Sequence, residues 1–594
     1  MASVPIVASA LKTRLLVAAI DFGTTFSGYA YSFLSDFKTD PLKIHTQNWT
    51  TGSHSAHGMS LKTSTCVLFN EKREFHSFGF EAEDVYTALA VEDQHHEWYY
   101  FKQFKMYLYQ NKDLRRETVL YDDKGNTMPA IEVFAAGIGY LKDKVIESIS
   151  KRQTEITPND IHWVLTVPAI WDDSAKQFMR EAAVYAGIDT NHLSLALEPE
   201  AASLFCKYLP VEKIIGVDGA PKIASFAPGK KYLVLDAGGG TVDITVHETQ
   251  EDGTVREIYK ANGGPWGGVT IDEAFLKLLD DIAGRDTMEV FMNEYKEDHL
   301  SLVRDFELKK KTFGPELGDS KIQFRMPINI HVAYSVVNGQ DFRQSFMMNQ
   351  DLKGDVTFTG DKLRVKPKQV LDLFQTTCVE IINHLKDILS KPEVAGVEAI
   401  LMVGGFSESN MLQHYVKSSF PNLFVIIPEE AGLAVLKGAV IFGHNPNAII
   451  SRRCKLTYGV KMYRTFEPGV HPPSKKVMRG GEAKCQGCFD VHVTTNEEVV
   501  LGQIFETHSY CPIVASAKAV GVKIYTSTKA KPLYVDEPEC TFLGEIDVDL
   551  SHIRDNFKDK KILVHMKYGG TELGVEAKVV KTGEILKTTL NCLG

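Results

Sequence analysis

The sequence has few cysteines, and their number is odd: nine in 594 residues. Cysteines spread this thinly do not form the disulfide framework of a secreted protein, so we expect mostly buried free thiols and a cytoplasmic location. One close pair, Cys485-Gln486-Gly487-Cys488, has the spacing of a zinc knuckle or a redox motif. No second pair and no His-x-His partner lies nearby, so zinc binding or redox chemistry there stays a minor alternative.

The sequence also lacks long apolar runs and an excess of positive charge. No uncharged stretch of about 18 residues occurs, so no membrane span is predicted. The net charge is −10, and basic runs such as Lys309-Lys310-Lys311 are short, which argues against nucleic acid as the main partner. Hydrophobic residues make up 44% and charged residues 24%, which is ordinary for a globular chain with several domains.

What is present is one short motif in two copies, with Asp21 and Asp236 at equivalent places. Each copy reads as a buried strand, an Asp, a Gly/Thr turn and a returning strand. Glycines let backbone N–H groups approach a phosphate, and a carboxylate at the strand end suits Mg²⁺ with its waters. One copy alone would be an ordinary hairpin. Two copies, facing each other across a cleft, can hold a polyphosphate from both sides, and such an internal repeat is hard to obtain by chance.

The order of predicted elements indicates an α/β architecture followed by antiparallel β structure. Residues 1–13 form a tail. Strands and helices alternate over 14–448, which we divide into a first lobe at about 14–230 and a second at about 231–448. Residues 449–594 alternate apolar and polar side chains, with turns predicted at Gly569-Gly570 and Thr582-Gly583.

Several elements can be placed more closely. Residues 161–167 predict a strand ended by Pro168, and a helix should follow from a cap at Asp173 or Ser174 to Gly187. A longer helix should begin after Pro367, since apolar residues then recur with the helical period. A strand at 399–403 opens into Gly404-Gly405-Phe406-Ser407. Ser407 is expected to cap the helix beginning near Ser409, leaving backbone N–H groups for an anion.

Two further segments carry a family resemblance. They are Val164-Leu165-Thr166-Val167-Pro168-Ala169-Ile170-Trp171 and Leu197-Glu198-Pro199-Glu200-Ala201-Ala202. Together with the two hairpins, they resemble the actin-like ATPase superfamily and, within it, the seventy-kilodalton heat-shock protein family. The segments 20–29, 177–183 and 456–460 are similar to its divergent heat-shock protein twelve branch. The resemblance covers essentially the whole chain and is strongest to about residue 445.

The resemblance implies a two-lobed actin-like (ribonuclease-H-like) ATPase domain that binds ATP or ADP with Mg²⁺. Asp21, Asp236 and Asp243 match the acidic residues around the metal. Glu198 matches a carboxylate that orders the attacking water, and Lys105 resembles the lysine beside the γ-phosphate, although an ordinary surface lysine is an equal alternative. The residues assigned to catalysis are therefore Asp21, Lys105, Glu198, Asp236 and Thr241.

The same resemblance implies a set of nucleotide-binding residues. Those expected at the phosphates are Gly23, Thr24, Thr25, Gly238, Gly239, Gly240 and Thr241, with the pair Gly267 and Gly268 beside them. Those expected near the ribose and the base are Glu307, Lys310, Lys311, Gly404, Gly405, Phe406 and Glu408. A plain charged helix face is the alternative for the group around Lys310.

Three features depart from the family pattern. Many members have two arginines against the adenine, whereas Lys311 and Glu408 stand here, and an ammonium lacks the planar stacking surface of a guanidinium. The usual Asp- and Leu-rich interdomain linker is replaced by residues 449–456, which contain the basic pair Arg452-Arg453. No helical lid is expected after the β domain, which we interpret as a degenerate substrate-binding-like domain.

These features favour an ATP-binding chaperone-like protein of the heat-shock and stress-response type, with slow Mg²⁺-dependent ATPase activity. ATP would close the two lobes and alter the surface offered to protein partners or clients through the C-terminal β domain. The alternative is a scaffold that senses nucleotide without hydrolysing it, and a small-molecule kinase is a remote third. The oligomeric state cannot be predicted.

Overall fold

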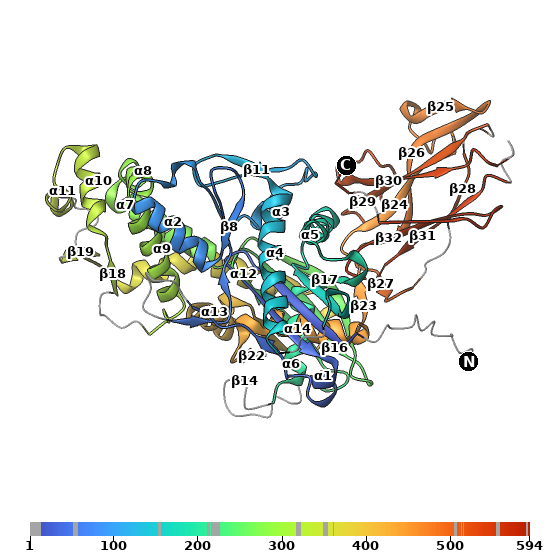
Figure 1. The fold of residues 1–594 in the computed structure, drawn as a ribbon. Coiled ribbons are helices and arrows are strands. Elements are labelled where there is room, and N and C mark those ends of the chain that lie inside the picture. The colour runs from blue at the N-terminus through green and yellow to red at the C-terminus, as the bar shows by residue number, and fades with distance from the viewer. Residues whose placement is uncertain are drawn as a thin grey trace.

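The computed structural model has two α/β lobes and a C-terminal β domain (Figure 1). The predicted fold class, an α/β protein with a C-terminal antiparallel β domain, is therefore confirmed. The structure describes residues 14–50, 58–152, 156–210, 214–215, 226–316, 322–348, 355–359, 361–503, 508–512, 514, 516–553, 559–568, 570–589 and 592–593.

The first lobe is built on a six-stranded sheet in the order β13-β12-β1-β2-β3, with β6 paired to β2. β1, β12 and β13 are parallel, and β1 and β2 form the first predicted hairpin. The sheet strands are β1 (Leu16–Phe22), β2 (Phe26–Phe33), β3 (His45–Thr46), β6 (Thr63–Ser64), β12 (Ile161–Val167) and β13 (Leu193–Leu197). The helices are α1 (Leu34–Thr39), α2 (Phe80–Val91), α3 (Met106–Gln110), α4 (Ala130–Ser150), α5 (Asp173–Tyr185) and α6 (Glu198–Tyr208).

Short strands complete this lobe. They are β4 (Trp49–Thr50) with β5 (Met59–Ser60), β7 (Cys66–Phe69) with β8 (Phe75–Phe78) and β9 (Tyr99–Lys102), and β10 (Val119–Tyr121) with β11 (Thr127–Pro129). All seven residues of β1 are buried. The strand that ends at the first Asp motif is therefore held rigidly in the core.

The second lobe is built on an eight-stranded sheet in the order β14-β22-β21-β15-β16-β17-β23-β27. Its strands are β14 (Ile214–Ile215), β15 (Lys231–Ala237), β16 (Val242–Thr249), β17 (Val255–Gly264), β21 (Val397–Val403), β22 (Phe424–Pro428), β23 (Ile449–Arg453) and β27 (Glu498–Val500). β15 and β16 form the second predicted hairpin. β23 and β27 follow the predicted boundary at residue 448, so the sheet continues into the region assigned to the C-terminal domain.

The helices in this part of the chain lie beside the sheet and extend well beyond it (Figure 1), and the last of them packs mainly on α6 and β1 of the first lobe. They are α7 (Val269–Ala283), α8 (Arg285–Glu294), α9 (Lys296–Lys310), α10 (Ile328–Asn338), α11 (Phe342–Met348), α12 (Pro367–Leu389), α13 (Asn410–Ser419) and α14 (Ala434–His444). A small sheet contains β18 (Ile322–Arg325), β20 (Lys362–Val365) and β19 (Val356–Thr359).

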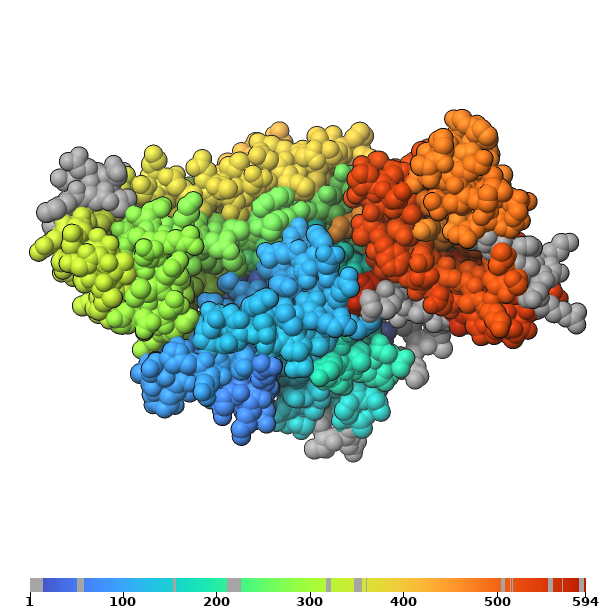
Figure 2. Space-filling view, turned by 90° about the horizontal axis from the view of Figure 1, so that it is seen from above, coloured from blue at the N-terminus to red at the C-terminus, as the bar shows by residue number. Residues whose placement is uncertain are grey.

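The C-terminal domain contains two antiparallel sheets that share one apolar core. The five-stranded sheet contains β25 (Lys476–Arg479), β26 (Glu482–Val493), β24 (Thr457–Thr465), β29 (Ala519–Ser527) and β30 (Cys540–Asp549). The four-stranded sheet contains β28 (His508–Tyr510), β31 (Ile562–Lys567), β32 (Gly574–Val579) and β33 (Ile585–Thr589). The domain packs beside the two lobes in the space-filling view (Figure 2).

Most of the predicted elements are confirmed, and two helix caps differ. The strand before Pro168 and the helix from Pro367 have the expected positions. The helix predicted to be capped by Asp173 or Ser174 is capped by Asp172, whose side chain accepts from the Ala175 N–H. The helix predicted to be capped by Ser407 is capped by Ser409, whose side chain accepts from the Leu412 N–H. Ser407 donates to the Val403 carbonyl instead. A cap must stand directly before its helix to reach the free N–H groups, which decides both positions.

The prediction of mostly buried free thiols is also confirmed, because six of the nine cysteines are buried free thiols. Cys485 and Cys488 are both buried on β26, where the pairing with β24 shifts register. That bulge brings residues three apart to the same side of the strand, which a regular strand would not do. Of the predicted turn residues, Gly569 lies outside the described residues.

Candidate nucleotide site

The turns of the two hairpins face each other, as the repeated motif predicts. A Cβ on Gly239 would lie 2.4 Å from Thr25 Oγ1, and one on Gly240 would lie 2.6 Å from Thr24 Oγ1. A side chain on Gly239 would therefore displace Thr25, and one on Gly240 would displace Thr24 and Met106. The glycines and threonines of the two motifs, which come from different lobes, thus form the two sides of one narrow site.

The second turn also contacts the start of α7. The N–H groups of Gly267, Gly268 and Val269 donate to the carbonyls of Gly240, Gly238 and Gly239, at 3.2, 3.1 and 2.9 Å. These bonds place the predicted glycine pair directly beside the turn. Gly404 approaches from β21 with a φ of +85°, and a Cβ there would lie 2.4 Å from Asp236 Oδ1. Only glycine accommodates both that backbone conformation and that approach.

Four carboxyl groups converge behind the turns: Asp21, Glu198, Asp236 and Asp243. Asp236 and Asp243 are direct cross-strand neighbours on β15 and β16. Asp236 Oδ2 is buried and has no hydrogen-bond donor among the described residues. Burial, with the nearby charges of Glu198 and Asp243, raises the pKa of Asp236 well above its ordinary value. An ionised Asp236 would need a cation, so this group of oxygens fits a magnesium site.

Lys105 lies against Glu198 inside the site. Its ammonium is 2.8 Å from Glu198 Oε1 and 5.2 Å from the centre of the Trp171 ring. Lys105 is only 3% exposed, which excludes the alternative of an ordinary surface lysine. Burial raises the pKa of Glu198 to about 7, although Lys105 opposes that rise. Glu198 can therefore exchange a proton near neutral pH.

Asp21 has a partner that the sequence did not indicate. Lys62, in the loop before β6, places its ammonium 2.6 Å from Asp21 Oδ2, while Thr166 donates to Oδ1 at 2.8 Å. Burial alone would raise the pKa of Asp21, but Lys62 and Lys105 outweigh it and the pKa lies below its ordinary value. Asp21 is therefore ionised. No motif surrounds Lys62, so the tertiary structure alone reveals it.

Asp243 is held by two donors instead of facing the turns freely. The Ile170 N–H donates to Oδ1 and Thr241 Oγ1 donates to Oδ2, each at 2.9 Å. The Thr241 hydroxyl, which we expected at the phosphate, is thus engaged with the third acidic residue. Ile170 follows Pro168 in one of the family-like segments, so that segment contacts the acidic cluster directly.

The residues expected near the ribose and base lie at the far side of the turns, and most of them have protein partners. Lys310 is buried, 2.5 Å from Asp272 Oδ2 and 3.0 Å from the Gly268 carbonyl. Lys311 pairs with Glu408 at 2.8 Å, joining the end of α9 to the turn after β21. Phe406 is 5% exposed and belongs to the core of the second lobe. Glu307 is half-buried on α9, and Gly405 lies beside Phe406.

The segment predicted as a linker is docked by buried charges. Arg452 forms two bonds to Glu200, Nε to Oε1 at 2.6 Å and Nη2 to Oε2 at 2.7 Å. The Arg453 N–H donates to Glu257 Oε2 at 3.1 Å. Lys455 donates to the carbonyl of Ile170, the residue whose N–H contacts Asp243. One residue thus touches both the acidic cluster and the segment leading to the C-terminal domain.

The C-terminal domain also contacts α5 of the first lobe. Arg180 forms a bidentate pair with Glu572, at 2.6 and 2.5 Å, and Tyr458 donates to Asp173 at 3.0 Å. A cavity of about 570 Å³ lies at this interface, away from the hairpin turns. Leu593 is buried within the core of the first lobe. The β domain therefore packs on the lobe that contains Asp21 on β1 and Glu198 at the start of α6.

Comparison with known proteins gives the same picture. A family model described as Hsp70 protein matches residues 94–444. Heat shock 70 kDa protein 12B of Homo sapiens is 34% identical over 641 aligned residues, 97% of this chain and 91% of the relative. Heat shock 70 kDa protein 12A of Mus musculus is 34% identical over 636, 98% and 92% respectively. Chaperone protein DnaK of Thermotoga neapolitana is 26% identical over 327 residues, 53% of this chain.

The paired hairpins, the acidic cluster and these matches define an actin-like, nucleotide-binding type of protein, and the chain belongs to the Hsp70 family. Its similarity over nearly the whole length to heat shock 70 kDa proteins 12A and 12B places it in their divergent branch. Proteins of this family in general bind ATP or ADP with Mg²⁺. Among the helices described here, none combines the length and apolarity that crossing a bilayer requires.

Proposed function

We propose that this chain is a chaperone-like ATP-binding protein and a slow Mg²⁺-dependent ATPase, whose nucleotide state controls the docking of its C-terminal β domain and the binding of protein partners. The observation that carries the proposal is the buried Oδ2 of Asp236, which has no donor among the described residues, in a side chain close to three other carboxyl groups. Such an arrangement is costly without a cation. The cytoplasmic location stays a prediction.

The metal would be held by Asp21 and Asp236, with Asp243 nearby, and the phosphates by the two Gly/Thr turns. Bound magnesium would supply positive charge to the phosphate oxygens. Lys62 would have to leave Oδ2 of Asp21 for the metal to use that oxygen. Lys105, buried beside Glu198, would add a second positive charge close to the reacting phosphate.

Glu198 is the residue proposed to orient the attacking water. Its pKa of about 7 makes it a proton acceptor at neutral pH when ionised, and its bond from Lys105 fixes the position of the carboxylate. Phosphoryl transfer needs positioning and charge stabilisation more than covalent catalysis. We expect Glu198, Lys105 and the bound metal to supply both, without a nucleophilic side chain.

Communication with the β domain would pass through the segment 168–173. Its residue Ile170 contacts Asp243 on one side and Lys455 on the other. A shift of Asp243 when metal binds would therefore change the position of Lys455 and the docking of the C-terminal domain. Protein partners would then meet a different surface.

The alternative is a nucleotide-sensing scaffold that does not hydrolyse ATP. Two ion pairs favour it: Lys62 occupies an oxygen of Asp21, and Lys311 is joined to Glu408 where the base is expected. Both pairs would have to open for a metal-bound nucleotide to take the predicted position. A small-molecule kinase would need an acceptor site, and no described feature supports one.

A single-turnover assay with γ-labelled ATP, beside direct binding of ATP and ADP, separates these possibilities. We expect Mg²⁺-dependent phosphate release that falls by at least about 100-fold in Asp236→Asn. That variant should stay folded, because it replaces one of four neighbouring buried carboxyl groups with a neutral amide. Release unchanged in Asp236→Asn would refute the proposed role. Tight binding without release would establish the scaffold.

A further inference from the structure

Two clusters of histidine and aspartate lie outside the nucleotide site, each with three ligand atoms within 4.8 Å of one another. One contains Asp93, His95 and His96, between α2 and β9. The other contains Asp490, His492 and His508, in the C-terminal domain. Histidine nitrogens with a carboxylate oxygen form the usual donor set for zinc and related divalent cations. The two clusters differ in how firmly the protein holds their ligand atoms.

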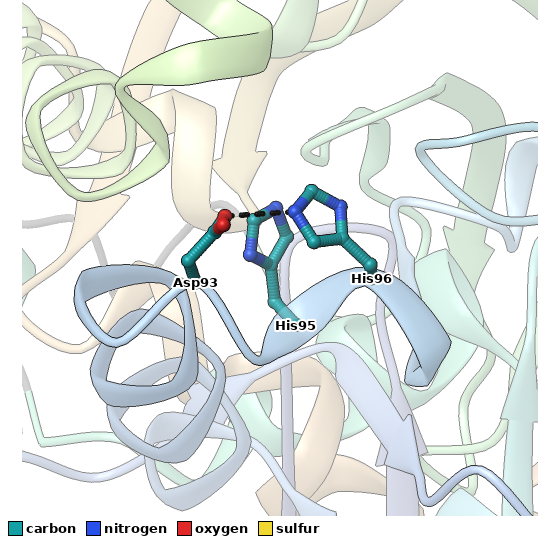
Figure 3. Close-up of side chains that lie close together, drawn as sticks. All are labelled: Asp93, His95 and His96. Atoms are coloured by element: carbon teal, nitrogen blue, oxygen red, sulfur yellow. Dashed lines mark hydrogen bonds and ion pairs between the residues drawn. The ribbon is translucent and has the colours of Figure 1, made fainter.

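The first cluster is poorly placed for a metal (Figure 3). Asp93 and His96 pair on the surface, at 2.8 Å, with side chains 84% and 61% exposed. Lys124 donates to the backbone carbonyls of both histidines, so its positive charge lies close by. Asp93 and His96 are three residues apart on one exposed turn, and both come from the same short segment of chain. This cluster is therefore the weaker candidate.

The second cluster is positioned by two sheets. Asp490 and His492 are two residues apart on β26, so their side chains project from the same face of that strand. His508 is on β28, an edge strand of the other sheet. The rings of His492 and His508 stack with centroids 3.9 Å apart and planes inclined by 22°. Strands on both sides thus set the positions of all three ligands.

Hydrogen bonds orient these side chains. His508 Nδ1 lies 2.8 Å from Asp490 Oδ2, and His492 Nε2 lies 2.7 Å from the Tyr510 hydroxyl. That hydroxyl donates to the same Oδ2 at 2.7 Å. Arg464, half exposed, is 3.4 Å from the other oxygen of Asp490. Because Tyr510 holds the carboxylate and one imidazole together, it would act as the outer support that metal ligands usually have.

We propose that Asp490, His492 and His508 bind a zinc-type divalent cation that joins the two sheets of the C-terminal domain. His492 would offer Nε2 and His508 would offer Nδ1, each with its proton on the other ring nitrogen, so that metal bonds replace the hydrogen bonds that these two atoms make to Tyr510 and Asp490. A neutral imidazole has one ring nitrogen with a lone pair, which is the atom that would bind the cation. A water would complete four-coordination.

The expected role of this metal is to fix β28. That strand is three residues long, His508–Tyr510, and pairs only with β31 among the described strands. A strand so short has few ladder bonds to hold it. A metal shared with β26 would connect it to the longest strand of the facing sheet, and the order of that edge would then depend on the metal.

The test is titration of chelator-treated full-length protein with ZnCl₂ by calorimetry, repeated with CoCl₂ to record the ligand-field spectrum. We expect one cation per chain, a cobalt spectrum of a low-symmetry nitrogen/oxygen site, and a higher thermal midpoint with zinc. His508→Ala and Asp490→Asn should each weaken binding by more than about 100-fold. His508 is only partly buried, so this variant should fold, which circular dichroism would verify.

His96→Ala is the matched control, since it removes a histidine from the other cluster and should leave zinc binding unchanged. The proposal is overturned if zinc does not bind one site per chain, or if binding survives the loss of both His508 and Asp490. Binding abolished by His96→Ala alone would also overturn it, because the metal would then belong to the exposed cluster.

Discussion

Arg452 and Glu200 form a bidentate ion pair with side chains only 8% and 1% exposed. Glu200 lies in the first turn of α6, two residues after Glu198. The pair therefore joins the segment leading to the C-terminal domain to the helix that begins at the proposed water-positioning residue. The basic pair that departs from the family's usual linker thus has a defined structural partner.

Removing one member of this pair should destabilise the protein strongly. We expect Arg452→Met and Glu200→Gln each to cost about 3–5 kcal/mol, because each leaves a buried polar partner uncompensated. The double variant should cost less than the sum of the two. Denaturant unfolding of the wild type, both single variants and the double variant measures this coupling.

Lys230→Met is the control for that experiment. Lys230 pairs with Glu398 at 2.8 Å, but the two side chains are 37% and 46% exposed. Its loss should cost less than about 1 kcal/mol. Equal costs for the buried and the exposed pair would show that Arg452 does not anchor the segment.

The rate of ATP turnover should depend on the ionisation of Glu198. Its pKa is about 7, and the ionised form is the one able to accept a proton, so we expect turnover to rise as pH increases through that region. Glu198→Gln should lower turnover by about 100-fold or more and remove this inflection, with little change in ADP affinity. Single-turnover rates across the pH range test it, with the exposed Glu289→Gln as control. An unchanged profile in Glu198→Gln would assign the inflection elsewhere.

Glu257 should make stability decrease with increasing pH. Burial raises its pKa from 4.5 to about 8, so the folded state holds a proton that the unfolded state has lost. Its contribution is fully present below the unfolded pKa and is lost as pH rises through the folded value. Between about pH 6.5 and 8, Glu257→Gln should therefore flatten the fall in unfolding free energy. Glu398→Gln, a surface control, should leave the pH dependence of the unfolding free energy unchanged. An unchanged pH dependence in Glu257→Gln would contradict the assignment.

A guanidinium at position 408 should improve nucleotide binding. In the expected base site Glu408 pairs with Lys311 at 2.8 Å, and neither group offers a planar cationic surface. Glu408→Arg should tighten ADP binding about fivefold, as a stacking contact worth about 1 kcal/mol would. Calorimetric titration measures this, with Glu398→Arg controlling for the added charge. Weaker binding in Glu408→Arg would mean that the Lys311–Glu408 pair itself supports the nucleotide.

Local patterns predicted much of the fold and of the site's composition. The strand before Pro168 and the helix from Pro367 follow from periodicity, because burial of one face repeats along the chain. The two hairpin turns meet as expected, with Thr25 close to Gly239 and Thr24 close to Gly240. The caps were misplaced by one or two residues, because several neighbouring polar side chains offer the same chemistry.

The sequence by itself determined the kinds of elements, the repeated Asp and Gly/Thr motif and the family. The tertiary structure alone decided that Lys62 pairs with Asp21, 41 positions away, and Arg452 with Glu200, 252 positions away. It also brought His508 beside Asp490 and His492. A charged side chain carries no local signal of its partner, since the partner is selected by how whole strands and helices pack and by the cost of burying an unpaired charge.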